Sequence, residues 1–295
     1  AFGLICNHRK REIMRRNVLS PYIIVAIFFT ALFAPIISAN DTTISSNTTW
    51  SGNITLEGNV TISQGTTLIV APGTTIDGGD GFAIEVYGTL NAQSCYFYSS
   101  ANPTAQSSHG QGLWQGIVIK SGGSATITDV EIENTNVGVK SEGNLDVDNL
   151  TVRDSYLGIK NYGTANIEEF YSEYIDYEAI MNIGSLTLSA ANISNTSTGI
   201  QSTGTLEVTN SSFSHIGAAI TVKSGAATVN QIRLHTVSVG LSSVAGVKFS
   251  AANITGTDVG LLVDMANSDD LTLTSIEASG ENFVKSSEAS STRIS

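Results

Sequence analysis

The feature that most constrains this chain is a glycine or alanine that recurs every 20 to 22 residues between residues 116 and 280. The recurring positions are Gly116, Gly138, Gly158, Ala179, Gly199, Ala219, Gly240 and Gly260. A second series keeps the same pitch at Gly123, Gly143, Gly163, Gly184, Gly204, Gly225 and Gly246. Two residues after these glycines comes an alternating apolar pair, such as Leu145 and Val147. Alternation with period two predicts strands, and a fixed period near twenty predicts an array of similar units.

The short unit favours one architecture. A repeat of about twenty residues has room for short strands separated by turns rich in Gly, Asn, Ser and Thr, but it cannot bury its apolar face alone. Stacking the units in parallel and in register, about 4.8 Å apart, buries a continuous column. Helical repeats need longer units, and the leucine-rich repeat pattern is missing from the sequence. We therefore predict an all-β parallel solenoid, right-handed by the crossover rule.

Two stretches point to a family. The text of residues 60–76 runs Val-Thr-Ile, then Gly-Thr-Thr-Leu-Ile-Val-Ala-Pro-Gly-Thr, and Trp114-Gln115-Gly116-Ile117 restarts the array. Both resemble segments of secreted β-helix proteins of archaea and bacteria. Together with the periodicity, the chain resembles the right-handed parallel β-helix family, the pectate-lyase-like superfold. This resemblance implies a secreted or cell-surface location.

The chain divides into three predicted regions. Residues 1–39 read as upstream residues followed by a signal peptide, with the start at Met14 and cleavage after Ala39; an uncleaved N-terminal anchor is the alternative. Residues 40–50 form a polar tether. Residues 51–295 form the β-helix, with capping and first coils at 51–97, an insertion loop at 98–113, regular coils at 114–280 and an incomplete last coil at 281–295.

Charge and cysteine content narrow the classes of partner. Without residues 1–39 the chain carries 9 basic and 25 acidic residues, a net charge of −16. Such a chain repels nucleic acid and anionic membranes, so we expect membrane contact only through the N-terminal signal or anchor.

Cys95 is then the remaining cysteine, so the stacked coils must provide stability without a disulfide. We expect no cofactor apart from the calcium ion considered below, and the sequence makes no prediction of oligomeric state.

The sequence also contains Asn-x-Ser/Thr sequons. A chain rich in Asn, Ser and Thr generates them by chance, but an exported chain can be glycosylated at them. The candidates are Asn47, Asn53, Asn59, Asn149, Asn192, Asn210 and Asn253.

A solenoid places residues one period apart above one another, so charged positions become ladders. Lys120, Lys140 and Lys160 are predicted to share one outward position, with Lys223 further on. In an enzyme acting on polyuronates, such lysines would bind sugar carboxylates and abstract a proton. The alternative is a solvated stripe whose charges are screened.

Carboxylates form two further predicted ladders. Asp148 and Glu168 fall one period apart and provide the oxygen ligands that Ca²⁺ prefers. Glu133, Arg153 and Glu173 alternate in sign and predict a structural ion-pair stack. The catalytic motifs of polygalacturonases are missing from the sequence, and so is the metal-plus-arginine set of pectate lyases.

Aromatic residues concentrate in one coil. Tyr171, Tyr174 and Tyr177, with Glu173 among them, are candidates for stacking on sugar rings, although packing within the column is an equal alternative. His109 in the insertion loop is a further candidate binding residue.

We favour a secreted or cell-surface protein with a structural or adhesive, non-catalytic role, whose partners are extracellular glycans or cell-surface components. A polysaccharide lyase or glycoside hydrolase acting on acidic glycans is the alternative, and a non-catalytic carbohydrate-binding module is a third.

Overall fold

The computed structural model describes residues 40–101, 113–244, 246–266, 271–279 and 282–287. The predicted signal peptide, most of the insertion loop with His109, and the last eight residues lie outside these ranges. No helix in the described ranges is long and apolar enough to cross a membrane. The strands are β1 Thr42–Ile44, β2 Thr48–Trp50, β3 Asn53–Thr55, β4 Val60–Ile62, β5 Thr67–Val70, β6 Thr75–Asp77, β7 Ala83–Val86, β8 Thr89–Tyr98, β9 Gly116–Ile119, β10 Ser124–Glu133, β11 Val137–Ser141, β12 Asn144–Ser155, β13 Leu157–Asn161, β14 Thr164–Asn182, β15 Ser185–Ser189, β16 Asn192–Ser202, β17 Thr205–Val222, β18 Ala226–Ser243, β19 Lys248–Ala266, β20 Leu271–Ser279 and β21 Asn282–Ser287.

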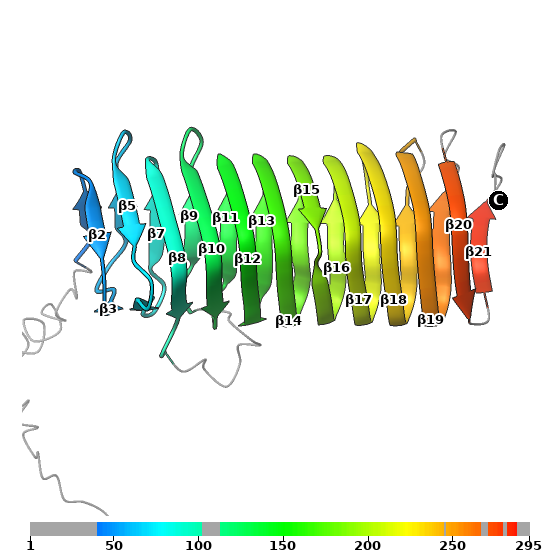
Figure 1. The fold of residues 1–295 in the computed structure, drawn as a ribbon, viewed down its shortest axis with the longest axis horizontal. Coiled ribbons are helices and arrows are strands. Elements are labelled where there is room, and N and C mark those ends of the chain that lie inside the picture. Colours follow the sequence, from blue (N-terminus) through cyan, green and yellow to red (C-terminus); the bar gives the residue numbers. More distant parts are fainter. Residues whose placement is uncertain (1–39, 102–112, 245, 267–270, 280–281, 288–295) are drawn as a thin grey trace, which may run out of the picture. The chain divides into compact units, whose positions relative to one another are not determined.

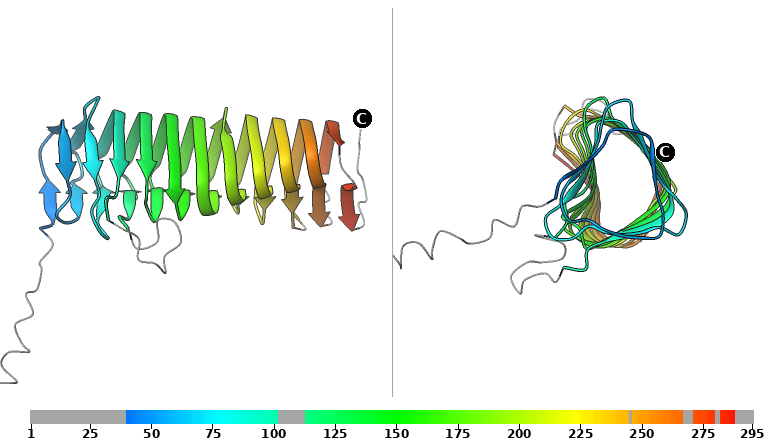
Figure 2. Two further views of the ribbon diagram at one scale, coloured as in Figure 1. Left: turned by 90° about the horizontal axis from the view of Figure 1, so that it is seen from below. Right: turned by 90° about the vertical axis from the view of Figure 1, so that its left-hand side faces the viewer.

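The strands pair in parallel with strands one coil before and one coil after them. β10, for example, pairs with β8 on one side and with β12 on the other. The coils follow one another along a single axis (Figure 1), and seen end-on they wind around a roughly triangular outline (Figure 2). The predicted parallel β-solenoid is confirmed.

The register of the regular coils follows the apolar pattern of the sequence. One continuous row contains Leu145, Ala165, Leu186, Leu206, Ala227 and Phe249. Each member of this row is at most 4% exposed. The residues that the periodicity placed inside the column therefore do form its core, and burial of this apolar surface is the main stabilising contribution.

Three corners turn the chain within each regular coil. Asn149 and Asp154 occupy the first two in β12 and have positive φ angles of 64° and 49°, a conformation that Asn and Asp tolerate better than most residues. The third corner is formed by the second glycine series. A Cβ added at Gly163 would lie 2.0 Å from the carbonyl oxygen of Gly143 in the preceding coil, so a glycine is required there.

These corners separate three faces. The first, which we call the lysine face, comprises β7, β9, β11, β13 and the C-terminal ends of β14, β16, β17 and β18. The second face contains the N-terminal part of β12 and the residues that pair with it. The third, which we call the groove face, contains β6 and the C-terminal parts of β8, β10 and β12. The candidate sites lie on these outer faces.

The first coil is formed by β1, β2 and β3, which pair with β4, β5 and β6. Trp50 in β2 is partly buried and packs against the core.

Inside the column, the apolar filling is interrupted by two asparagines. Asn161 and Asn182 are fully buried. The Nδ2 of Asn161 donates to the Oδ1 of Asn182 at 2.9 Å, and the Nδ2 of Asn182 donates to the Oγ of Ser202 at 3.0 Å. Because these buried amides have hydrogen-bond partners in neighbouring coils, the interior tolerates them.

Candidate functional site

The predicted ladder of three lysines is wrong in its register. Lys140 and Lys160 are direct partners on β11 and β13, but the residue opposite Lys140 in the preceding coil is Val118. Lys120 lies two positions further along, because the step from Gly116 to Gly138 is 22 residues long. Lys223 is displaced in the same direction, since Thr221 occupies the equivalent position in β17.

The lysines of this face are compensated by carboxylates and ring faces. The Nζ atoms of Lys120 and Lys140 lie 2.8 Å from carboxylate oxygens of Glu85 and Glu142, respectively. The hydrogen bond that Lys120 donates to Glu85 raises the pKa of Lys120, and the bond that Lys140 donates to Glu142 lowers the pKa of Glu142. These pairings offset the repulsion that stacked lysines would otherwise suffer.

The two lysines that are in register share one aromatic ring. The ammonium groups of Lys140 and Lys160 lie 5.5 and 5.3 Å from the ring centroid of Tyr162. These distances are within the range of cation–π attraction. Lys120, Lys140 and Lys160 on the lysine face therefore each have a carboxylate or an aromatic ring as a partner.

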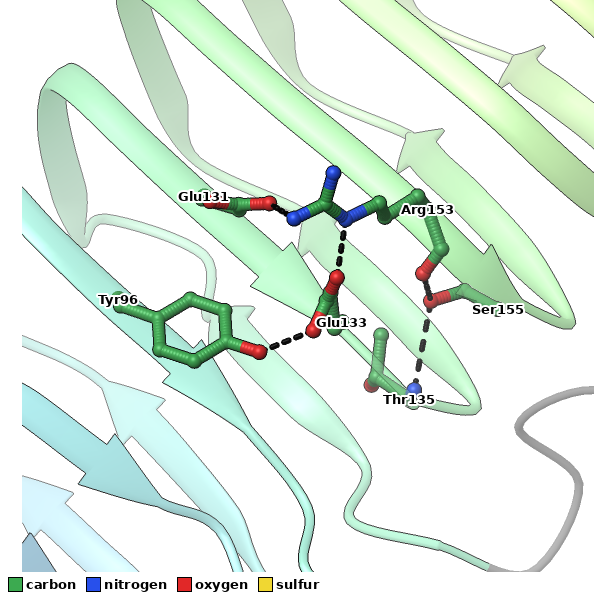
Figure 3. A network of polar contacts seen from close by, with 6 residues as sticks. All are labelled: Tyr96, Glu131, Glu133, Thr135, Arg153 and Ser155. Atoms are coloured by element: carbon green, nitrogen blue, oxygen red, sulfur yellow. Dashed lines mark hydrogen bonds and ion pairs between the residues drawn. The ribbon is translucent and has the colours of Figure 1, made fainter.

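The groove face carries a polar network centred on Glu133 (Figure 3). This carboxylate accepts hydrogen bonds from the Tyr96 hydroxyl and from the Nε of Arg153. A second nitrogen of Arg153 forms an ion pair with Glu131. The four side chains come from three consecutive coils and point toward one another (Figure 3). One guanidinium therefore serves two carboxylates.

The predicted stack of Glu133, Arg153 and Glu173 is in register as expected. Its bonding differs from the prediction in one respect. Among the described ion pairs, Arg153 bonds Glu131 and Glu133, whereas Glu173 accepts a hydrogen bond at 3.1 Å from the Nδ2 of Asn195.

Beside the network lies an open groove of about 440 Å³. Its lining residues come from the turn before β6 and from β8, β10 and β12: Gly73, Thr74, Thr75, Ser94, Cys95, Tyr96, Asp129, Val130, Glu131, Asn149 and Thr151. Sequence reasoning missed this groove. The coil containing Thr74 and Thr75 precedes the glycine series, so periodicity could not show that it lies beside Tyr96 and Glu131.

Burial sets the protonation of two groove residues. Burial, followed by the hydrogen bond to Glu133, raises the pKa of Tyr96 well above its ordinary value. Burial also raises the pKa of Cys95 to about 12. Both side chains are therefore neutral at physiological pH, and the carboxylates determine the charge of the groove.

The tyrosines of β14 point to the outside of the column. Tyr171, Tyr174 and Tyr177 are 43%, 50% and 50% exposed, whereas Phe170 is fully buried. The ring of Tyr177 stacks on that of Tyr156 with centroids 5.8 Å apart. The alternative, packing of these tyrosines inside the column, is wrong.

The predicted calcium ligands also occupy neighbouring coils. Asp148 and Glu168 are register partners on the second face, and both are exposed. Among the described residues, no group of three or more His, Cys, Asp or Glu side chains is placed to hold a metal ion. Calcium binding at this pair stays a prediction.

The sequon asparagines differ in accessibility. Asn47, Asn53, Asn192, Asn210 and Asn253 are exposed. Asn59 and Asn149 are half-buried; the Oδ1 of Asn59 accepts from the Ala83 amide, and the Nδ2 of Asn149 donates to Asp129 at 2.9 Å. Nδ2 is the atom that carries a glycan, so at Asn149 the modified atom is one that is already hydrogen-bonded.

No protein-family model matches the sequence, and no curated protein matches it. Two solved structures are similar in fold. The A-module of the mannuronan C-5 epimerase AlgE6 of Azotobacter vinelandii matches 86% of this chain and 87% of its own, with 10% identity and a TM-score of 0.41. The Streptococcus pneumoniae surface protein and adhesin PfbA matches 83% of this chain and 91% of its own, with 10% identity and a TM-score of 0.35. The β-helix assignment rests on the parallel strand pairing of this chain.

Proposed function

We propose that this protein is a non-catalytic, secreted or cell-surface β-helix protein that adheres to extracellular glycans or other cell-surface components. The observation that carries the proposal is the outward placement of Tyr171, Tyr174 and Tyr177, each with 43–50% of its surface exposed. Tyrosine combines a large apolar ring with a hydroxyl, so it stacks on sugar rings and hydrogen-bonds their hydroxyl groups. Glu173, exposed in the same strand, adds an acceptor for such hydroxyls.

The charged side chains support a non-catalytic role. A lysine that abstracts a proton works best when its pKa is lowered toward the operating pH. The pairing with Glu85 instead raises the pKa of Lys120, and Lys140 is paired with Glu142. Lys120 is therefore suited to holding a positive charge and poorly suited to accepting a proton, and the ammonium group of Lys140 is already engaged in an ion pair.

Glycan-array binding tests the proposal. We expect binding that weakens about tenfold or more in a Tyr171→Ala, Tyr174→Asn, Tyr177→Ala triple variant, since each aromatic contact contributes on the order of 1 kcal/mol. Asn is chosen at position 174 because the φ angle there is 55° and Asn tolerates that conformation. The matched control is Tyr162→Ala, which removes a tyrosine that is 41% exposed on the lysine face.

A lyase assay tests the competing class. The protein is incubated with polygalacturonate or alginate, and unsaturated products are followed by their ultraviolet absorbance. We expect no product. Product formation that disappears in Lys140→Ala would overturn the proposal.

A further inference from the structure

We infer that the groove beside Tyr96 binds a glycan through hydrogen-bond donors on its sugars, with amino sugars, whose ammonium groups are the strongest donors, bound best. This inference rests on the proposed function in taking the ligand to be a glycan, and it names the class of glycan. The ligand class differs from the acidic glycans that were considered for the lysine face.

The charge of the groove selects the ligand. Asp129 and Glu131 line it, and none of the described residues that line it is a lysine or an arginine. The nearest cation described beside it, Arg153, is already bonded to Glu131 and Glu133. Uronate or sulfated sugars would meet Asp129 and two glutamates that share one guanidinium, an excess of negative charge, whereas ammonium and hydroxyl groups would meet acceptors.

The shape and rigidity of the groove suit a sugar. Its volume of about 440 Å³ falls within the range of small-ligand sites. The Tyr96 ring is held in place by its hydroxyl bond to Glu133 (Figure 3). It also stacks on Tyr98, with ring centroids 5.1 Å apart. Because the ring is already ordered, binding a sugar against it costs little side-chain entropy.

The groove also lies in line with Tyr171, one of the exposed tyrosines of β14. Tyr96, Glu131, Thr151 and Tyr171 are successive register partners on the groove face. At the spacing of parallel strands, the three steps from Tyr96 to Tyr171 cover about 14 Å along the coil axis. An oligosaccharide lying along this axis would contact the groove with one end and Tyr171 with the other.

Calorimetric titration with three oligosaccharides of equal length tests the inference. The probes are a glucosamine oligomer at a pH where its amines are protonated, its neutral N-acetylated counterpart and an oligogalacturonate. We expect the glucosamine oligomer to bind most tightly, the neutral one more weakly, and the oligogalacturonate not to bind at the groove.

Two groove variants separate charge from shape. Asp129→Asn with Glu131→Gln removes both carboxylates and should weaken glucosamine binding about tenfold or more, since hydrogen bonds to charged groups are the strong ones. Thr151→Trp fills the groove without changing its charge and should abolish binding of both the charged and the neutral probe. The matched control, Asp148→Asn with Glu168→Gln in calcium-free buffer, makes the same charge change on the second face and should bind as the parent does. Thermal unfolding of each variant checks that it is folded.

The outcomes are distinct. Oligogalacturonate binding as tight as that of the glucosamine oligomer would overturn the inference, and so would an affinity unchanged by the groove variants. If glycans bind on the array through the β14 tyrosines while the groove variants have no effect, this inference fails alone. If no glycan binds in either experiment, the proposed function fails with it.

Discussion

The lysine face and the groove face are built from the same coils, but they balance their charges differently. On the lysine face, Lys120 and Lys140 each have a carboxylate partner at 2.8 Å. On the groove face, the single guanidinium of Arg153 serves both Glu131 and Glu133, and Asp129 lies nearby in the groove lining. On the lysine face, Lys120 and Lys140 are each matched by one carboxylate, whereas beside the groove three carboxylates accompany the one guanidinium of Arg153.

This difference shows how a repetitive fold acquires a local site. Stacking brings every outward residue next to its neighbours one coil away, so the balance of cations and carboxylates is set by register. Where cations and carboxylates are equal in number, they can pair with one another on the surface. Where carboxylates outnumber cations beside a groove, a ligand that carries hydrogen-bond donors can bind to the remaining acceptors.

Removing the shared cation should have the largest effect. Arg153→Ala leaves Glu133, whose side chain is only 16% exposed, and Glu131 without their ion pairs. We expect a loss of about 1–3 kcal/mol in the free energy of unfolding, measured by urea denaturation. Arg153→Lys should lose less, because it keeps the charge but not the forked geometry that reaches two carboxylates. A loss no larger than that of Lys140→Ala would contradict the contrast between the faces.

Glu178, on the lysine-face side of β14, differs from the ion-paired carboxylates of that face. It is only 4% exposed, and its Oε2 has no hydrogen-bond partner in the described part of the chain. Burial raises its pKa above the ordinary value of 4.5, an effect that the charges of Lys223 and Lys160 only partly oppose. The native state therefore holds the proton more tightly than the unfolded state does, and stability falls as pH rises from about 4.5 through the native pKa.

Replacing this carboxyl with an amide should remove that pH dependence. In Glu178→Gln, the free energy of unfolding should vary less between pH 4 and pH 8 (an approximate window around the ordinary and raised pKa values) than it does in the parent protein. The measurement is a series of urea denaturations across that window, with the exposed Glu207→Gln as the matched control. Identical slopes for Glu178→Gln and the parent would show that Glu178 ionises freely in the folded protein.

The smallest effects should come from the closed pairs of the lysine face. Lys120→Met and Lys140→Met each remove one partly exposed ion pair, so we expect each to cost about 0–1 kcal/mol. The difference from the parent should shrink as salt is added, because exposed charges are screened. A salt-independent loss would mean that these lysines stabilise the protein by packing.

The core was predictable from the sequence because burial repeats. Leu145, Ala165 and Leu206 occur one or more periods apart, and each points inward. The buried Asn161 and Asn182 gave no such signal, since an asparagine in a turn-rich chain looks the same whether it faces the column or the solvent.

The surface was less predictable because an outward residue leaves no apolar signature. The position of Lys120 was missed because glycine spacing reveals that two residues are added between Gly116 and Gly138 but not where the ladder shifts. The groove required knowing that Thr74 and Thr75 lie one coil below Cys95 and Tyr96, in a part of the chain without the repeated glycines. The tyrosines could be named from the sequence, but the direction in which their rings point could not.

Cysteine cross-linking tests the register on which the comparison of the two faces depends. In a chain whose native Cys6 and Cys95 are replaced by serine, the pair Lys140→Cys and Lys160→Cys places partner positions about 4.8 Å apart, within disulfide reach. The pair Lys120→Cys and Lys140→Cys is offset by two residues, so its Cα atoms should be about 8 Å apart, beyond that reach. Peptide mapping after mild oxidation should find the first disulfide and not the second. Efficient cross-linking of Lys120→Cys to Lys140→Cys, with none between positions 140 and 160, would contradict the account.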